Sequence, residues 1–256
     1  MSEPVGVLFD RSSLANHPLI ARQLVKLPAL NIPNLREDVR ALACRDWEDR
    51  TRAEYIGVMI VRKFHSLLVD LGAPMDLQEL ALVMLLQEQR HAALCMACAC
   101  ALGSDGEVAF ELPELQQSPG PDLEQDLVGM VVGTYGIGEV VALALLRHTL
   151  RALPASPFRD TLRQIQRDEV LHARIGDLFL QELQTGGWFR WPGDAFATDT
   201  ANRTLGAMRT RDVIEPDTIV LFGDPLAAAQ LLSVGIPEPL GFRSAYHRAL
   251  DRIPKV

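Results

Sequence analysis

A glutamate and a histidine three residues apart occur twice in this chain, as Glu88-x-x-His91 and as Glu169-x-x-His172. Residues three apart lie on the same face of a helix, so each pair would present a carboxylate beside an imidazole. A helical stretch with one glutamate in mid-run precedes each pair, carrying Glu54 before the first pair and Glu139 before the second. One such pair arises easily by chance, but the repeated order is specific.

These six residues predict a site for two metal ions. Burying a carboxylate is costly unless it is paired or bound to a metal, and the four glutamates lie among apolar helical residues. Carboxylate oxygen and neutral imidazole suit iron or manganese, and two divalent ions roughly balance four carboxylates. The order Glu, Glu-x-x-His, Glu, Glu-x-x-His is the ligand set of a two-metal site inside a four-helix bundle.

The spacing of apolar residues predicts four long helices, over about residues 46–71, 76–102, 122–153 and 156–184. Asp46 and Asp76 are acceptable N-caps for the first two helices. Glycine or proline follows each predicted C-terminal end. The fold class is therefore predicted to be all-α.

The lengths of the connections predict the topology. The first and second helices, and the third and fourth, are joined by short turns and should form antiparallel hairpins. The link over residues 103–121 can run the length of a bundle, because an extended chain spans about 3.3 Å per residue. One long crossover between two hairpins is the ferritin-like arrangement. At about 1.5 Å of rise per residue, the four glutamates can reach one layer.

Residues 46–185 resemble the ferritin-like di-iron carboxylate proteins, and the matching pieces are Glu54, Glu88-x-x-His91, Glu139 and Asp168-Glu169-x-x-His172. The resemblance implies that Glu88 and Glu169 bridge the two metals. It also implies that Glu54 and Glu139 are terminal ligands and that each metal takes one histidine.

Asp168 looks like the acid that, in this family, orients an imidazole of the opposite Glu-x-x-His pair. Gln87 occupies the equivalent place in the first pair. The resemblance therefore implies that the surroundings of the two imidazoles differ.

A run of three glycines, Gly133-Thr134-Tyr135-Gly136-Ile137-Gly138, precedes Glu139. Each glycine within a helix costs about 1 kcal/mol relative to alanine, so the run needs a reason. Close helix packing or a local bulge is one explanation. The other is a cavity beside the metals for dioxygen or substrate, opened by Gly136 and lined by Tyr135, which could also donate a hydrogen bond.

The two ends of the chain differ from the middle. Residues 1–45 contain prolines that interrupt helices and predict an N-terminal strap, extended over residues 27–33 and with a short helix possible around residues 35–44. Residues 186–256 predict an extension packed on the bundle, with short helices near residues 225–234 and 243–253. Cys95, Cys98 and Cys100 fall on different faces of a helix and are expected to be buried small residues.

Composition excludes several classes of protein. The formal charge of −8 argues against nucleic acid as a partner. Charged residues interrupt every long apolar run, so no membrane span is expected. The N-terminus carries Glu3 and Asp10 and does not resemble a secretory signal. Four cysteines without a disulfide-like framework favour a reducing cytoplasm.

The leading hypothesis is a di-iron oxidase or oxygenase that activates dioxygen to oxidise a small organic substrate. It would use two iron ions, or a mixed manganese–iron pair, and an unknown electron donor. The chain is expected to be a monomer or a small oligomer such as a homodimer. The alternative is a ferroxidase or iron-storage protein, which the long proline-rich ends disfavour because storage needs a compact cage subunit.

Overall fold

The computed structural model describes residues 4–9, 12–22, 24, 27 and 30–253, with 73% helix and 3% strand. The predicted all-α class is confirmed. Within these residues the elements are β1 (Val5–Leu8), a 3₁₀ turn (Ser13–Asn16), α1 (Pro18–Ala21), α2 (Glu37–Asp70), α3 (Met75–Leu102), β2 (Glu107–Phe110), α4 (Leu112–Leu115), α5 (Leu123–Met130), a π-helical segment (Val131–Gly138), α6 (Glu139–Ala152), α7 (Pro157–Thr185), α8 (Asp194–Arg209), α9 (Pro216–Phe222), α10 (Pro225–Ser233) and α11 (Pro239–Asp251).

Helix α2 begins at Glu37, so the prediction of Asp46 as its N-cap is wrong. The short helix considered possible around residues 35–44 is the first part of α2 rather than a separate element of the strap. Glu37 and Asp38 place negative charge in the first turn, which favours a helix N-terminus. The apolar stripe of the helix already begins at the buried Val39. Asp46 instead forms an ion pair with Arg50 one turn further along the same helix.

The other long helices begin and end close to the predicted residues. Helix α3 begins after Pro74 rather than after Asp76, and it ends at Gly103, whose φ of 120° favours glycine. The Ser156 side chain accepts a hydrogen bond from the Arg159 amide and caps α7. The third predicted helix is α5 and α6 joined by the π-helical segment, which contains the glycine run.

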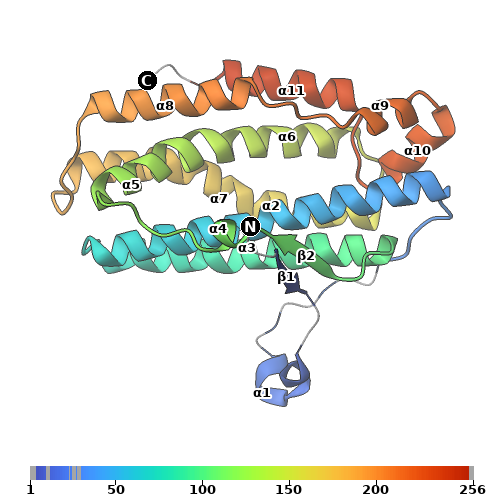
Figure 1. Cartoon of the computed structure of the whole chain (residues 1–256), viewed down its shortest axis with the longest axis horizontal. Helices are drawn as coiled ribbons and strands as arrows, with labels where there is room; N and C mark the ends of the chain where they lie inside the picture. The colour runs from blue at the N-terminus through green and yellow to red at the C-terminus, as the bar shows by residue number, and fades with distance from the viewer. Residues whose placement is uncertain (1–3, 10–11, 23, 25–26, 28–29, 254–256) are drawn as a thin grey trace.

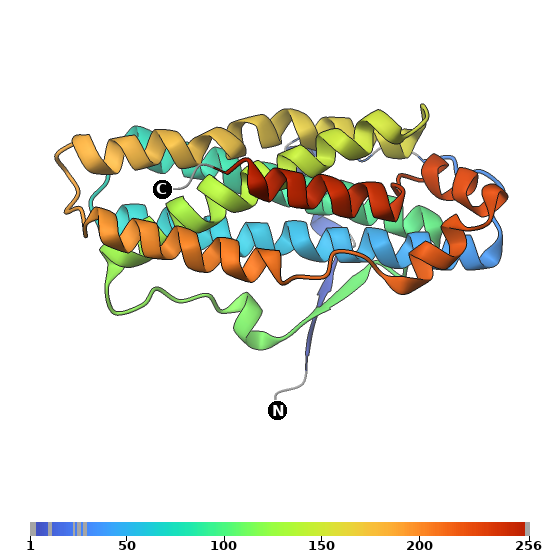
Figure 2. The same cartoon turned by 90° about the horizontal axis from the view of Figure 1, so that it is seen from above.

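The four long helical runs lie side by side (Figures 1 and 2). Helix α2 packs along α3, while α6 and the π-helical segment pack against α7. Contacts of α2 with α5 and of α3 with α7 join the two pairs. The connection from α3 to α5 runs alongside α2 and includes β2 and α4 (Figure 2).

The N-terminal segment contributes a strand that the sequence did not predict. Strand β1 pairs antiparallel with β2, with Val5 opposite Phe110. The pairing places an N-terminal strand on the connection between α3 and α5. The predicted extended stretch 27–33 falls partly outside the described residues, because these do not include 28 and 29.

The C-terminal region is helical and covers one side of the long helices (Figure 2). Helices α8 and α11 pack against each other, α8 contacts the π-helical segment and α11 contacts α6. Helices α10 and α11 correspond to the two short helices predicted there. Helices α8 and α9 were missed, since the buried positions of α8 include the small residues Ala197 and Ala201, which give a weak apolar signal.

By length and composition alone, the run Leu123–Ala152 is apolar enough to cross a membrane, with a mean hydropathy of 1.8 over its best window. Core helices of soluble proteins pass the same test. This run packs against α7, α8 and α11, and Glu139 lies within it.

Candidate metal centre

The six glutamates and histidines singled out in the sequence meet between the long helices. They form two groups of three, in each of which the potential ligand atoms lie within 4.8 Å of one another. The first group is Glu54 from α2, His91 from α3 and Glu169 from α7; the second is Glu88 from α3, Glu139 from α6 and His172 from α7. Each group could hold a metal ion.

The Nδ1 atoms of the two histidines face the carboxylates. His91 Nδ1 lies 3.1 Å from Glu169 Oε1 and 3.3 Å from Glu54 Oε2. His172 Nδ1 lies 3.1 Å from Glu88 Oε1 and 3.4 Å from Glu169 Oε2. Glu169 thus presents one oxygen to each imidazole, and the two rings are 6.0 Å apart between centroids. Glu88 is grouped with His172 and not with His91.

The Nε2 atoms point away from the carboxylates and have different partners. His91 Nε2 lies 3.1 Å from Asp168 Oδ2, and His172 Nε2 lies 3.0 Å from Gln87 Oε1. Each partner belongs to the opposite Glu-x-x-His helix, as the resemblance implied. An imidazole that binds a metal through Nδ1 carries its proton on Nε2, so both nitrogens would donate these hydrogen bonds.

Several buried atoms at the centre lack hydrogen bonds, and these atoms test whether metal ions fit. Both histidine Nδ1 atoms and Glu169 Oε2 have no hydrogen-bond partner within the described structure, although carboxylate oxygens lie nearby. Both histidines are completely buried. Unsatisfied polar atoms are expensive in a protein interior, and here they converge on one place. Carboxylates and imidazoles fit divalent ions there.

Without metal, protons compensate the buried charge. Burial raises the pKa of Glu54 to about 7, and burial together with the neighbouring Glu169 and Glu88 carboxylates raises the pKa of Glu139 well above its usual range. Burial lowers the pKa of each histidine, but the nearby carboxylates outweigh it and bring the pKa of His91 to about 11 and that of His172 to about 10. The two histidines hold the pKa of Glu169 below its usual value, against the effect of burial.

Apolar side chains enclose the centre on both sides along the helices. One cluster contains Phe64, Tyr135 and Phe179, and the other contains Trp47 and Phe158. On α2, α3 and α7 the ligand candidates fall between the residues of the two clusters. This placement buries the carboxylates of Glu88 and Glu169, which strengthens their interaction with a cation, while Glu54 and Glu139 remain partly exposed.

Gly57 in α2 is a site residue that the sequence reasoning missed. A Cβ atom at this position would lie 2.8 Å from the carboxyl carbon of Glu88, and still closer to Oε2. Any larger residue would therefore displace the Glu88 carboxylate. The available signal was a glycine three residues after Glu54 within a long helix, where glycine is disfavoured.

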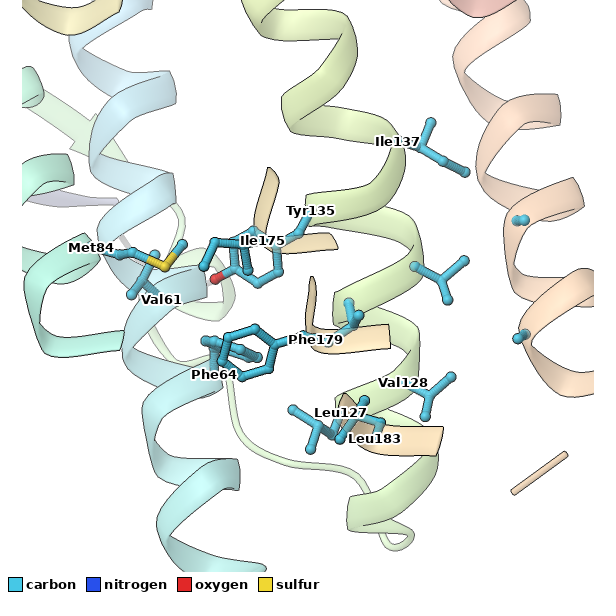
Figure 3. Close-up of a cluster of buried hydrophobic side chains, with 14 of the residues drawn as sticks. Val61, Phe64, Met84, Leu127, Val128, Tyr135, Ile137, Ile175, Phe179 and Leu183 are labelled. Carbon is cyan, nitrogen blue, oxygen red and sulfur yellow. The ribbon is translucent and has the colours of Figure 1, made fainter. Parts of the chain in front are cut away.

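Tyr135 and Gly136, the predicted cavity residues, lie next to the centre. Tyr135 is buried and packs against Phe64 with 4.9 Å between ring centroids, and its hydroxyl has no hydrogen-bond partner among the described residues (Figure 3). A Cβ atom on Gly176 of α7 would lie 2.5 Å from the Gly136 Cα. Close helix packing and a π-helical bulge therefore account for the glycine at 136, and the cavity stays a prediction.

The three cysteines of α3 were expected to be buried, which holds for Cys95 and Cys98 but not for Cys100, which is exposed. Burial raises the pKa of the Cys98 thiol to about 12 and the pKa of Cys95 well above its usual value. These two thiols are therefore protonated at neutral pH and behave as small apolar residues.

Comparison with known proteins assigns this chain to no family, since no family model, no curated protein and no solved structure matches it.

Proposed function

We propose that this chain is a di-iron carboxylate oxidase or oxygenase on a ferritin-like four-helix bundle. Its bundle helices would be α2, α3, α5 with α6, and α7, and residues 103–122 would form the long crossover. The position of Glu169, with one carboxylate oxygen beside each imidazole, carries the proposal. A carboxylate between two equivalent groups of ligands suits a pair of metal ions.

In this proposal the six residues would hold the ions, and Glu169 would serve both groups because one of its oxygens lies beside each imidazole. Iron fits the oxygen and nitrogen donors, and a mixed manganese–iron pair is the alternative. When bound, the ions supply the reduction of dioxygen. Asp168 and Gln87 accept hydrogen bonds from the two Nε2–H groups and so keep both Nδ1 atoms turned inward. The apolar clusters limit the access of water to the reacting groups.

Anaerobic titration of the metal-free protein with Fe²⁺ tests the site. About two irons per chain are expected, from the two groups of ligands. Glu169→Gln should reduce the bound iron, because it removes the shared carboxylate. Glu79→Gln on the exposed surface of α3 removes the same charge and should leave iron binding unchanged. Equal iron binding by the Glu169 and Glu79 variants would refute the site.

Exposure of the loaded, reduced protein to dioxygen separates the oxygenase from the storage protein. The proposal predicts dioxygen uptake without iron accumulation, and oxidation of an added organic substrate. Continued uptake of many irons per chain, together with a large hollow particle in light scattering, would instead support the ferroxidase or storage function.

A further inference from the structure

A depression of about 370 Å³ lies on the surface between the C-terminal part of α6 and the N-terminal part of α7. These two ends form a hairpin at one edge of the molecule, drawn in yellow-green in Figure 2. Arg147, Leu150 and Arg151 of α6 and Arg159 and Gln166 of α7 line it. Its lining therefore contains three guanidinium groups and no carboxylate.

The arginines are free to bind a ligand. The side chains of Arg147 and Arg151 form no ion pair or hydrogen bond with any residue that the structure describes. Arg159 donates from Nε to the Leu150 carbonyl oxygen at 3.2 Å, which orients its guanidinium. Its two terminal nitrogens have no partner among the same residues. Asp160, the acidic residue beside Arg159 in sequence, pairs with Arg163 instead.

This concentration of positive charge contrasts with the chain as a whole, whose formal charge is −8. Some arginines elsewhere have acidic partners, such as Arg52 with Glu114 and Arg203 with Asp199. The depression is distinguished by the three guanidinium groups that line one hollow. An arginine in the last turn of a helix can be explained by the helix dipole, and that accounts for Arg151. It does not account for Arg147 and Arg159, which lie outside that turn.

We propose that this depression binds the oxyanion group, a phosphate or a carboxylate, of a small molecule. Guanidinium groups present several donors in a fixed fork and bind such groups with two parallel hydrogen bonds. The Gln166 amide, which also lines the depression, offers a further donor. The site is separate from the six metal-ligand candidates and does not depend on the proposed function.

Isothermal titration of the full-length protein with inorganic phosphate at low ionic strength tests the proposal, with a chloride titration as reference. A second titration with succinate distinguishes a phosphate site from a carboxylate site. Saturable binding of at least one of the two anions is expected. Arg147→Gln with Arg151→Gln should weaken it at least tenfold. Both side chains are exposed, so the fold should be retained.

The matched control is Arg209→Gln with Arg211→Gln, which removes the same charge from exposed positions at the end of α8. This variant should bind the anion as the unmodified protein does. Three results would overturn the proposal: no saturable binding of either anion, unchanged binding in the Arg147 and Arg151 variant, or an equal loss in the control. The last would mean that general charge attracts the anion.

Discussion

The Nε2 atom of His91 lies 3.1 Å from a carboxylate oxygen of Asp168, on the opposite Glu-x-x-His helix. The corresponding partner of the His172 Nε2 atom is the amide oxygen of Gln87, at 3.0 Å. An imidazole whose N–H donates to a carboxylate is a better electron donor to a metal than one whose N–H donates to an amide oxygen. The two ligand groups therefore differ electronically, although their ligands are of the same types.

Removing the charge of Asp168 should weaken one metal position more than the other. Asp168→Asn is expected to lower the affinity of one of two binding steps by about 10- to 100-fold, the usual effect of losing such a partner. Titration with Co²⁺, monitored by calorimetry and by visible absorption, measures both binding steps. Gln87→Glu should strengthen the other step, and identical shifts of both steps in both variants would contradict the assignment.

Gly57→Ala should impair metal binding without unfolding the protein. The new Cβ would occupy the place of the Glu88 carboxylate, which can swing away because it is the end of a flexible side chain. Alanine is also the better helix former by about 1 kcal/mol. We expect an unchanged or higher melting temperature of the metal-free protein. We also expect weaker metal binding at the group that contains Glu88. Unchanged metal affinity would show that Glu88 does not contribute to the site.

Gly176→Ala should instead destabilise the fold itself. Its Cβ would meet the backbone of Gly136, which cannot move aside as a side chain does. Overpacking of this kind costs about 1–3 kcal/mol, and chemical denaturation of the metal-free protein measures it. Gly129→Ala in α5 is the control, because a Cβ there meets nothing within 4 Å. The control should be neutral or slightly stabilising, and equal stability of the two variants would contradict the close packing of α7.

The stability of the metal-free protein should fall as the pH rises from 6.5. The pKa values of His91 and His172 are raised from 6.5 in the unfolded chain to about 11 and about 10 in the folded protein. Their stabilising contribution is complete below pH 6.5 and is lost as the pH rises through the folded values.

Bound metal ions replace these protons, so the melting temperature of the Mn²⁺-loaded protein should depend less on pH. Thermal unfolding of both forms between pH 6.5 and 8.5 measures the difference. A metal-free protein that gains stability over this range would show that the histidines do not carry the protons that compensate the buried carboxylates.

The sequence alone determined the helical class, the ends of α3 and α7 to within a few residues, and the six candidate ligands. These are local properties, because a spacing of three residues, a capping serine and a run of apolar positions act within one helix. The start of α2 was misjudged because Asp46 resembles a cap, while the apolar stripe that continues to Val39 needs a partner surface to be buried.

Only the tertiary structure decided how the ligands are shared. It grouped Glu54 with His91 and Glu169, and it placed one oxygen of Glu169 beside each imidazole. Such groupings depend on how each helix is rotated about its axis, which spacing along the chain does not specify. The same holds for Gly57 and Gly176, since a missing side chain has meaning only when the atoms opposite it are known. It holds too for β1 and β2, which pair across about 100 residues of sequence.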